Sequence, residues 1–459
     1  MTKTPWLVMA LAALASGAAA QSAPPTLIRN ATVLTVTRGT LTETDLLMRD
    51  GKIAAIGRNL TAPAGATIVD GTGKFVSPGV IDPHSHLMAD AINEGSLSVT
   101  SMTRIQDVLN PTAQGIYRAL AGGVTLINIL HGSANTIGGQ SATVKLKWGR
   151  PASEMLMAGA PPGIKFALGE NVTRKNSNTF TIPGQPTPPR RYPTSRMGQA
   201  EVLRDAFTRA RDYQAEWVDY RARVARKEAN LVAPRRDLEL EPLVEILEGR
   251  RLVHGHSYRS DEMLMMLEVA KEFGFKIATL QHGLEGYKIA PEIAAHQAGL
   301  SLFADSWSYK IEAYDAIPYA AAIAVRAGVL TTINSDSEER IRRLNIDAAK
   351  MMRYGDLTED EAMALITING ARQLGVGDRT GSLEVGKDAD VTLWTAHPFS
   401  VYSRVETTYV DGVAYFDRAA DLRMREAMAA ERVELEKAAP NQAPSRGPQR
   451  PGATPPETR

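Results

Sequence analysis

The sequence predicts an α/β protein: a (β/α)8 (TIM) barrel with a small β-sandwich-like domain built from segments near both ends of the chain. Short apolar runs alternate with helical patterns through the middle of the sequence. We count eight such runs, the number of strands in this barrel. Polar side chains with ligand chemistry follow several runs, where a barrel carries its active site. A chain of 459 residues with 44% hydrophobic content can bury a core of this size.

The N-terminal residues have the features of a secretory signal. Lys3 precedes an apolar run, and the small residues Ala18 and Ala20 precede Gln21. We therefore expect residues 1–20 to be a cleaved signal peptide, which places the mature chain in the periplasm or outside the cell. The apolar run is shorter than the roughly 20 residues that a membrane span needs, so no span is expected after cleavage.

The small β domain is expected from residues 21–76 and 382–417. Turn residues separate the runs "TLIRNATVLTV", "LLMRDGKIAAIG" and "ATIVDGTGKFVSPG", a pattern that predicts a small antiparallel sheet. Residues 418–459 are expected to be helical and then to form a disordered, Pro-rich tail, because few large apolar residues occur near the C-terminus.

The barrel is expected over residues 77–381, with its strands parallel. The eight runs are "GVID", "VTLINIL", "ATVKLK", "IKFAL", "RLVHGH", "KIATLQ", "LSLFA" and "VLTTIN". Helical patterns lie between most of them. One covers residues 261–273, where apolar residues recur at helical spacing.

A long insertion, residues 171–249, separates the fourth and fifth runs. It begins with an irregular, basic stretch that leaves the rim of the barrel and could cover it as a lid. Arg174, Arg190 or Arg191 would then meet a substrate carboxylate, the alternative being solvated surface arginines. A long helix follows, with an apolar stripe that predicts packing rather than a binding surface. Its members are Leu203, Phe207, Ala210, Tyr213, Trp217, Tyr220 and Val224.

Several metal-ligating residue types fall at the strand ends. His84 and His86 end the first strand, and alternation along a strand puts both imidazoles on one face. The other candidates are Lys165 in the fourth strand, His256 at the end of the fifth, His282 after the sixth and Asp336 after the eighth. This set predicts a site for one or two divalent ions. The chain has no cysteine, which excludes disulfides, thiolate metal sites and a cysteine nucleophile.

Ordered motifs support this interpretation. The stretches "PGVIDPHSH", "HGHSYRSDE", "LQHGLEGYKIA", "TTINSDS" and "NGARQLGVGDRTGSLEVGKDADVTLW" resemble the amidohydrolase superfamily of metal-dependent hydrolases, in its imidazolonepropionase-like and prolidase-like branch. With "DGKIAAIG" the resemblance covers residues 26–416. It implies that His84, His86 and Asp336 hold one metal, Zn²⁺ by preference, and that His256 and His282 hold a second where there is one.

The role of Lys165 follows from the same resemblance. Some families of the superfamily carry a lysine on the fourth strand whose carbamate bridges two metals, and "GIKFALGEN" resembles that pattern. Lys145, Lys147 and Glu170 are rivals for the bridging role. Without a bridging residue the site holds a single metal.

The remaining candidates concern the chemistry. Asp336 is expected to accept a proton from the attacking water and pass it to the leaving nitrogen, as in the resembled families. Tyr258, Arg259 and His131, or a second metal, are candidates for stabilising charge on the carbonyl oxygen. His131 could equally be a plain loop residue. His254, one layer deeper than His256, is expected to support a ligand or to pack in the core.

These observations predict an exported, metal-dependent amidohydrolase that cleaves a C–N bond of a dipeptide, N-acyl amino acid or cyclic amide through a metal-activated hydroxide. The alternatives are a nucleobase-type deaminase and a non-catalytic barrel subunit. A net charge of +1 argues against a nucleic-acid partner. The expected partners are a small-molecule or dipeptide substrate, with a second copy of the chain or a homologous subunit possible.

Overall fold

The computed structural model describes residues 24–174 and 191–438. The predicted signal peptide, Arg190 and the Pro-rich part of the tail lie outside these residues. No helix within the described ranges combines the length and the apolar character needed to cross a membrane.

Segments from both ends of the chain form one small domain, as predicted. Its strands are β1 (Thr26–Leu34), β2 (Thr40–Arg49), β3 (Lys52–Gly57), β4 (Thr67–Asp70), β5 (Phe75–Pro78), β14 (Val391–Trp394), β15 (Val405–Val410) and β16 (Val413–Asp417). They pair in the order β16-β15-β14-β5-β1-β2-β3, with β4 also on β1. The expected antiparallel sheet is mixed, because β1 runs parallel to β4 and β5. β5 joins the two chain segments through β1 and β14.

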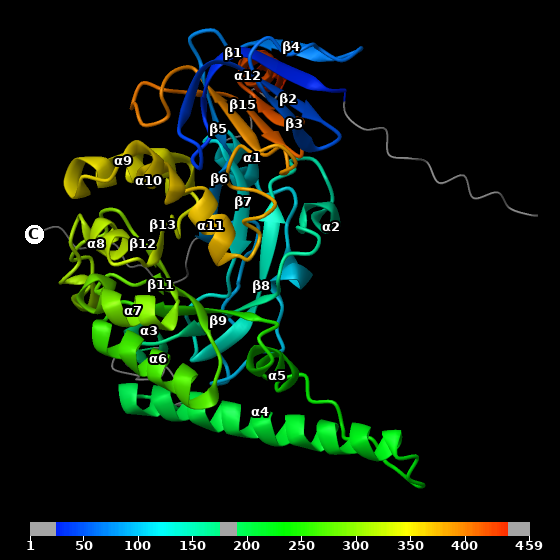
Figure 1. Cartoon of the computed structure of the whole chain (residues 1–459), viewed down its shortest axis with the longest axis vertical. Coiled ribbons are helices and arrows are strands. Elements are labelled where there is room, and N and C mark those ends of the chain that lie inside the picture. Colours follow the sequence, from blue (N-terminus) through cyan, green and yellow to red (C-terminus); the bar gives the residue numbers. More distant parts are fainter. Residues whose placement is uncertain (1–23, 175–190, 439–459) are drawn as a thin grey trace, which may run out of the picture.

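The second sheet is the predicted barrel, whose eight strands follow one another in chain order (Figure 1). They are β6 (Val80–Ser85), β7 (Val124–Ile129), β8 (Ile137–Lys145), β9 (Gly163–Ala167), β10 (Leu252–Ser257), β11 (Ile277–His282), β12 (Gly299–Leu302) and β13 (Leu330–Ile333). All eight predicted runs are strands. The expectation that all run parallel is wrong for β8, which is antiparallel to β7 and β9. Residues 130–136 join β7 to β8 without a helix, and so short a connection turns the chain back on itself.

Helices connect most of the remaining strands. They are α1 (Gln114–Leu120), α2 (Ala152–Met155), α6 (Ser260–Phe273), α7 (Ala290–His296) and α8 (Ala320–Arg326), followed after β13 by α9 (Leu344–Gly355), α10 (Glu359–Ala364) and α11 (Ile368–Gln373). The helix predicted over residues 261–273 is α6. The turn before α11 fills the gap between β6 and β13, since Leu365 accepts a hydrogen bond from Ile333 and Ile366 accepts one from Ile81.

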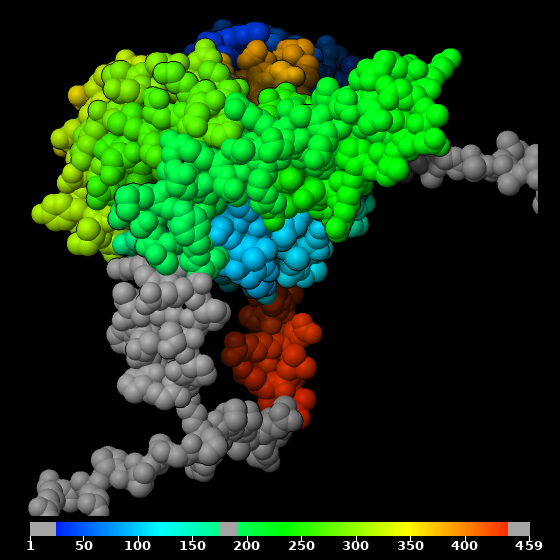
Figure 2. Space-filling view, turned by 90° about the horizontal axis from the view of Figure 1, so that it is seen from below, coloured from blue at the N-terminus to red at the C-terminus, as the bar shows by residue number. Residues whose placement is uncertain are grey.

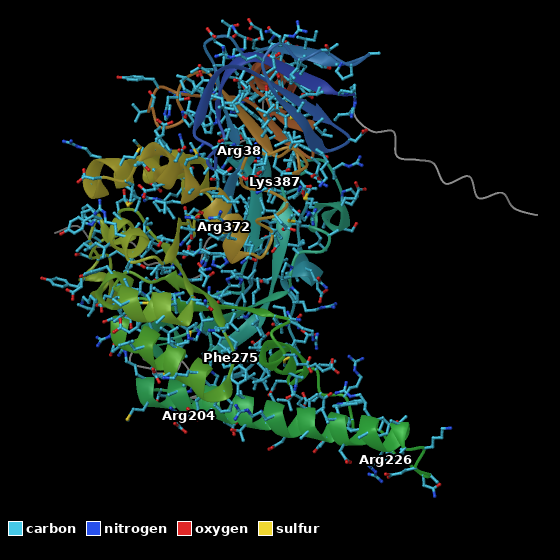
Figure 3. All side chains as sticks on the ribbon, in the orientation of Figure 1. Arg38, Arg204, Arg226, Phe275, Arg372 and Lys387 are labelled. Carbon is cyan, nitrogen blue, oxygen red and sulfur yellow. The ribbon has the colours of Figure 1, made fainter. Side chains whose placement is uncertain are left out.

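The insertion contains α3 (Glu170–Arg174), α4 (Arg196–Ala225) and α5 (Glu241–Leu247). The first half of α4 packs on the barrel helices as the stripe predicts, with Phe207 stacked on Phe275 at a ring distance of 4.3 Å. The second half extends past the barrel, and Val224 is exposed. Figure 3 labels Arg204 on the packed half and Arg226 at the free end. The stripe therefore predicts packing correctly only where another element lies against the helix.

The last described helix, α12 (Arg418–Ala438), follows the small domain and is almost entirely exposed. Figure 2 shows it projecting from the body of the molecule, with α4 lying across the face in view.

Candidate functional site

The two histidines of β6 meet Asp336 at one end of the barrel. The Nε2 atom of His86 lies 3.1 Å from Asp336 Oδ1, and His84 Nε2 lies 3.6 Å from the same oxygen. A ligand atom from each of the three residues lies within 4.8 Å of the others. The predicted one-metal triad is therefore assembled in space.

Hydrogen bonds orient both imidazoles. His86 Nδ1 donates to the carbonyl of Leu130 at 2.9 Å, and His84 Nδ1 donates to Gln281 Oε1 at 3.0 Å. With Nδ1 held in this way, each ring directs Nε2 toward Asp336. The amide nitrogen of Gln281 in turn lies 3.4 Å from His254 Nδ1. His254 thus supports Gln281, which supports His84, in agreement with the supporting role expected for His254.

The sequence reasoning missed Gln281 because of a backbone feature. Strand alternation would send the consecutive residues Gln281 and His282 to opposite faces. His282 has φ 70°, in the left-handed region, and Asp336 has φ 44°. Such conformations are strained for these residue types and persist where the surrounding structure enforces them. They let Gln281 and His282 both serve the site.

His256 and His282 form a second group of candidate ligands. Their rings lie 4.7 Å apart, and the ring of His282 is 4.4 Å from that of His84. Among the described residues, neither ring nitrogen of His256 has a hydrogen-bond partner, and Nδ1 of His282 also lacks one, although all three atoms are buried. Buried polar atoms are normally paired, so these nitrogens await a ligand. Burial lowers the pKa of His282 to about 3 and that of His256 well below its usual value, which keeps both rings in the neutral form that binds metals.

Lys165 is buried beside these histidines. Its Nζ lies 3.5 Å from His84 Nε2 and 3.3 Å from the carbonyl oxygen of His131. Burial lowers the pKa of Lys165 to about 8. Neither close contact supplies the negative charge that a buried ammonium needs. The donor set around Lys165 therefore fits one or two divalent cations, on the histidines with or without this lysine.

The rival lysines lie elsewhere. Lys145 Nζ sits among the carboxylates of Asp388, Asp390 and Asp411, at 2.8 Å from Asp388 and 3.1 Å from Asp390. These aspartates would otherwise form a candidate cation site, but the Lys145 ammonium lies among them, and Lys52 and Arg379 also pair with Asp388. Lys147 lies 2.8 Å from Asp411. Both lysines therefore join the small domain to β8 rather than serving the histidines.

Glu170, the third rival, lies beside another cation. Its Oε1 is 3.6 Å from Lys310 Nζ. Lys310 also lies 3.8 Å above the ring of Tyr258. Glu170 therefore lies beside Lys310 and Tyr258 near the rim.

A buried carboxyl group, absent from the sequence-based candidates, connects the two chain segments that carry His84 and Asp336. Asp82 accepts hydrogen bonds from Ser335 Oγ at 2.5 Å, from Ser335 N at 3.2 Å and from His84 N at 3.3 Å. Burial raises the pKa of Asp82 to about 7. The group links β6 to the residue before Asp336, so it holds His84 and Asp336 in register.

Of the three side chains predicted to stabilise the carbonyl oxygen, Tyr258 lies at the site. Its ring stacks on His282 at 5.4 Å and lies 4.8 Å from the ring of His256. Its hydroxyl accepts a 2.6 Å hydrogen bond from Tyr309.

The other two candidates, Arg259 and His131, form hydrogen bonds with neighbouring groups of the chain. The guanidinium of Arg259 makes hydrogen bonds of 2.9 and 3.0 Å to Asp261. His131 donates from Nδ1 to the carbonyl of Gly132 at 2.7 Å and accepts at Nε2 from Glu94 N at 2.9 Å. The structure does not bring Arg259 to the histidines, and it leaves His131 no ring nitrogen for a substrate.

A cavity of about 800 Å³ opens beside Asp336. Phe303, Trp307 and Tyr309 form an aromatic wall. The lining also includes Arg340 and Lys350, and each pairs with both Asp305 and Asp347. This volume suits a small molecule.

Of the three insertion arginines expected to meet a substrate carboxylate, the structure describes the side chain of Arg191. Arg191 donates to the backbone carbonyls of Gly95, Leu97 and Ala134, so its charge is engaged by the protein. The side chain of Arg174 and the whole of Arg190 lie outside the described residues.

We expect Gln281→Leu to weaken metal binding about 10- to 100-fold, because His84 would lose the acceptor that fixes its ring. Competition with a chelator, followed by elemental analysis, measures this. Gln214→Leu, the same change on exposed α4, is the control and should bind metal like the wild type. Equal metal affinity in Gln281→Leu would show that His84 is oriented by packing alone.

Comparisons with known proteins relate the chain to amidohydrolases. A model described as "Amidohydrolase family" matches residues 310–414. The crystal structure of an amidohydrolase from Thermotoga maritima is 34% identical, with 86% of this chain and 100% of that chain covered and a TM-score of 0.76. Amidohydrolase tasK of Hapsidospora irregularis is 32% identical over 86% of this chain, which spans only 43% of the length of tasK. Imidazolonepropionase of Brucella anthropi is 22% identical over 76% of this chain and 86% of its own.

Proposed function

The chain belongs to the amidohydrolase family, and from this premise we propose that it hydrolyses a C–N bond of a dipeptide, an N-acyl amino acid or a cyclic amide with the help of bound divalent metal. The observation that carries the proposal is the convergence of His84, His86 and His282 on Asp336, together with the unpaired ring nitrogens of His256 and His282. His84, His86 and Asp336 would hold one ion, and His256, His282 and a carboxylated Lys165 a second. Neutral imidazole and carboxylate ligands suit Zn²⁺.

A bound divalent ion would act as a Lewis acid and make water a nucleophile at neutral pH. The residues of the chain supply the proton transfers. Asp336 lies close to Nε2 of both His84 and His86, so its carboxylate would adjoin a water activated at this site. Asp336 would accept the proton of this water and return it to the leaving nitrogen.

Tyr258 would stabilise the carbonyl oxygen. The two hydroxyl groups lie 2.6 Å apart, so with Tyr309 as the donor the proton of Tyr258 would be available for a substrate oxygen. Burial raises the pKa of Tyr258 well above its usual value, so it remains a neutral donor across the working pH range. The aromatic wall of the cavity would contact the apolar part of the substrate.

We also propose that the protein acts after export. The support is the sequence pattern of residues 1–20 alone. Purification from a native host, followed by N-terminal sequencing, should give a chain that begins near Gln21. A mature chain that retains Met1 contradicts export by cleavage.

Elemental analysis and a substrate panel test the proposed activity. The purified protein should carry one or two equivalents of a divalent transition metal, and removal by a chelator should abolish turnover until metal is restored. The panel contains dipeptides, N-acyl amino acids and cyclic amides, with nucleobases to detect deamination. Less than a tenth of an equivalent, with no gain after addition of zinc, manganese or cobalt, contradicts the metal site.

Tyr258→Phe should lower kcat about 10²-fold with unchanged metal content, because the variant lacks only the hydroxyl that faces the carbonyl oxygen. Steady-state kinetics on the best substrate of the panel measures the effect. Tyr314→Phe, in the same loop region as Tyr309 but 74% exposed, is the matched control. Full activity in Tyr258→Phe would show that another group stabilises the carbonyl oxygen of the substrate.

A further inference from the structure

A second cavity lies between the barrel and the small domain and is lined by arginine. It has a volume of about 460 Å³ and is formed where α1, α12 and the 3₁₀ helix η4 (Arg340–Arg343) meet residues of β14, β15 and β16. Six of its lining residues are arginines: Arg118, Arg342, Arg343, Arg404, Arg418 and Arg425. They come from four separate parts of the chain, so the fold rather than a local run of basic sequence gathers them.

The positive charge of this cavity is poorly compensated. Asp421 is the one acidic residue among the described lining residues, which leaves a net charge of +5. Asp421 is already engaged, by Arg425 Nε at 2.8 Å and by the hydroxyl of Tyr117 at 3.2 Å. Glu339, just outside the lining, contacts both Arg342 and Arg343. Even with Glu339 included, the region keeps four positive charges in excess.

Further groups in the lining suit a ligand. The Nε atom of Arg342 is buried and has no hydrogen-bond partner among the described residues, so a donor is left unpaired in the wall. Ser400 and Ser403 also line the cavity, and the hydroxyl of Ser403 donates to the carbonyl of Ala396. Trp394 and Phe416, both 3% exposed, supply a rigid apolar surface. The cavity therefore combines many hydrogen-bond donors for an anion with a rigid apolar wall.

We propose that this cavity binds a small polyanion that carries phosphate groups, such as pyrophosphate or a phosphorylated metabolite. Guanidinium groups match phosphate oxygens in two-point hydrogen bonds. A single carboxylate would neutralise only one of several excess charges, whereas a ligand with two phosphate groups neutralises most of them. The confined volume selects a small molecule over a nucleic-acid strand. The site is separate from the histidines, and the proposal does not depend on the hydrolytic activity.

Calorimetric titration of the metal-loaded protein tests the proposal at constant ionic strength. Pyrophosphate should bind saturably at one site per chain, phosphate more weakly and acetate without measurable heat. Added salt should weaken the binding by screening. No saturable heat with pyrophosphate at millimolar concentration overturns the proposal.

Variants locate the binding site. Arg118→Gln with Arg342→Gln should weaken pyrophosphate binding at least about tenfold, because two charge-assisted contacts are lost. Arg343 is left unchanged because it also lines the cavity beside Asp336. The control is Arg204→Gln on α4 with Arg226→Gln directly after it, which removes the same charge away from the cavity and should bind like the wild type.

Pyrophosphate also binds divalent metals, so the variants separate the two sites. Binding that survives unchanged in the Arg118/Arg342 variant would lie at the histidines and contradict the proposal. If that double variant fails to fold, Arg118→Gln alone removes an exposed side chain and should still weaken binding. Arg118→Lys should give an intermediate affinity, since lysine keeps the charge but not the planar donor pair.

Discussion

Asp336→Asn is expected to lower kcat about a thousandfold while the protein stays folded. Asparagine fills the same space, but its amide cannot accept the proton of the attacking water. Asparagine also tolerates the left-handed backbone at this position, where φ is 44°, so the local structure should persist. Steady-state kinetics with the best substrate of the panel measures kcat, and circular dichroism confirms the fold.

Two further measurements make the Asp336 result specific. Asp315→Asn, which changes an exposed aspartate paired with Lys288, should keep wild-type turnover. Metal content must be measured in both variants, because Asp336 is also a proposed ligand and a loss of metal alone would lower kcat. Near-wild-type turnover in Asp336→Asn would show that another group accepts the proton of the attacking water.

The positions of the barrel strands were predicted correctly, but the direction of one strand was not. An apolar run such as "ATVKLK" is consistent with a buried strand and carries no information on its direction. The short connection between β7 and β8 makes that strand antiparallel. A connection without a helical pattern was visible in the sequence, and it is the signal that would have corrected the expectation.

The site residues were predictable where the residue type is a typical metal ligand and where alternation along a strand gives the direction of the side chain. The H-x-H spacing of His84 and His86 predicts a shared face, and the structure places both beside Asp336. Gln281 was missed because an amide has no distinctive sequence signal and because the left-handed backbone at His282 breaks the alternation.

Two residues predicted for the site from their sequence positions, Arg259 and His131, instead bind neighbouring groups of the chain. Arg259 follows a site strand, yet Asp261 takes its guanidinium two residues later. His131 follows β7, yet backbone groups occupy both of its ring nitrogens. Position at a strand end places a side chain near the rim. Whether that side chain is available for chemistry depends on hydrogen bonds that only the folded chain reveals.

Lys165→Ala is expected to lose one or both metal ions and nearly all activity. An unmodified ammonium at this position is buried, lies 3.5 Å from His84 Nε2 and would repel bound cations. Reaction of the amine with carbon dioxide gives a carbamate, which reverses the sign of the charge and offers two oxygens to the metals. Lowering of the Lys165 pKa to about 8 by burial makes the neutral, reactive amine more accessible.

The test of the bridge combines metal content with rescue. Acetate or formate should partly restore metal and turnover to Lys165→Ala, because a short carboxylate can occupy the vacated space. Lys165→Met removes the amine but keeps most of the apolar volume, so a loss of metal in this variant does not arise from a cavity. Lys147→Ala, which removes a lysine paired with Asp411, is the matched control and should keep its metal. Full metal content in both Lys165 variants would contradict the bridge and leave the metal on the histidines and Asp336, with the lysine free to contact substrate.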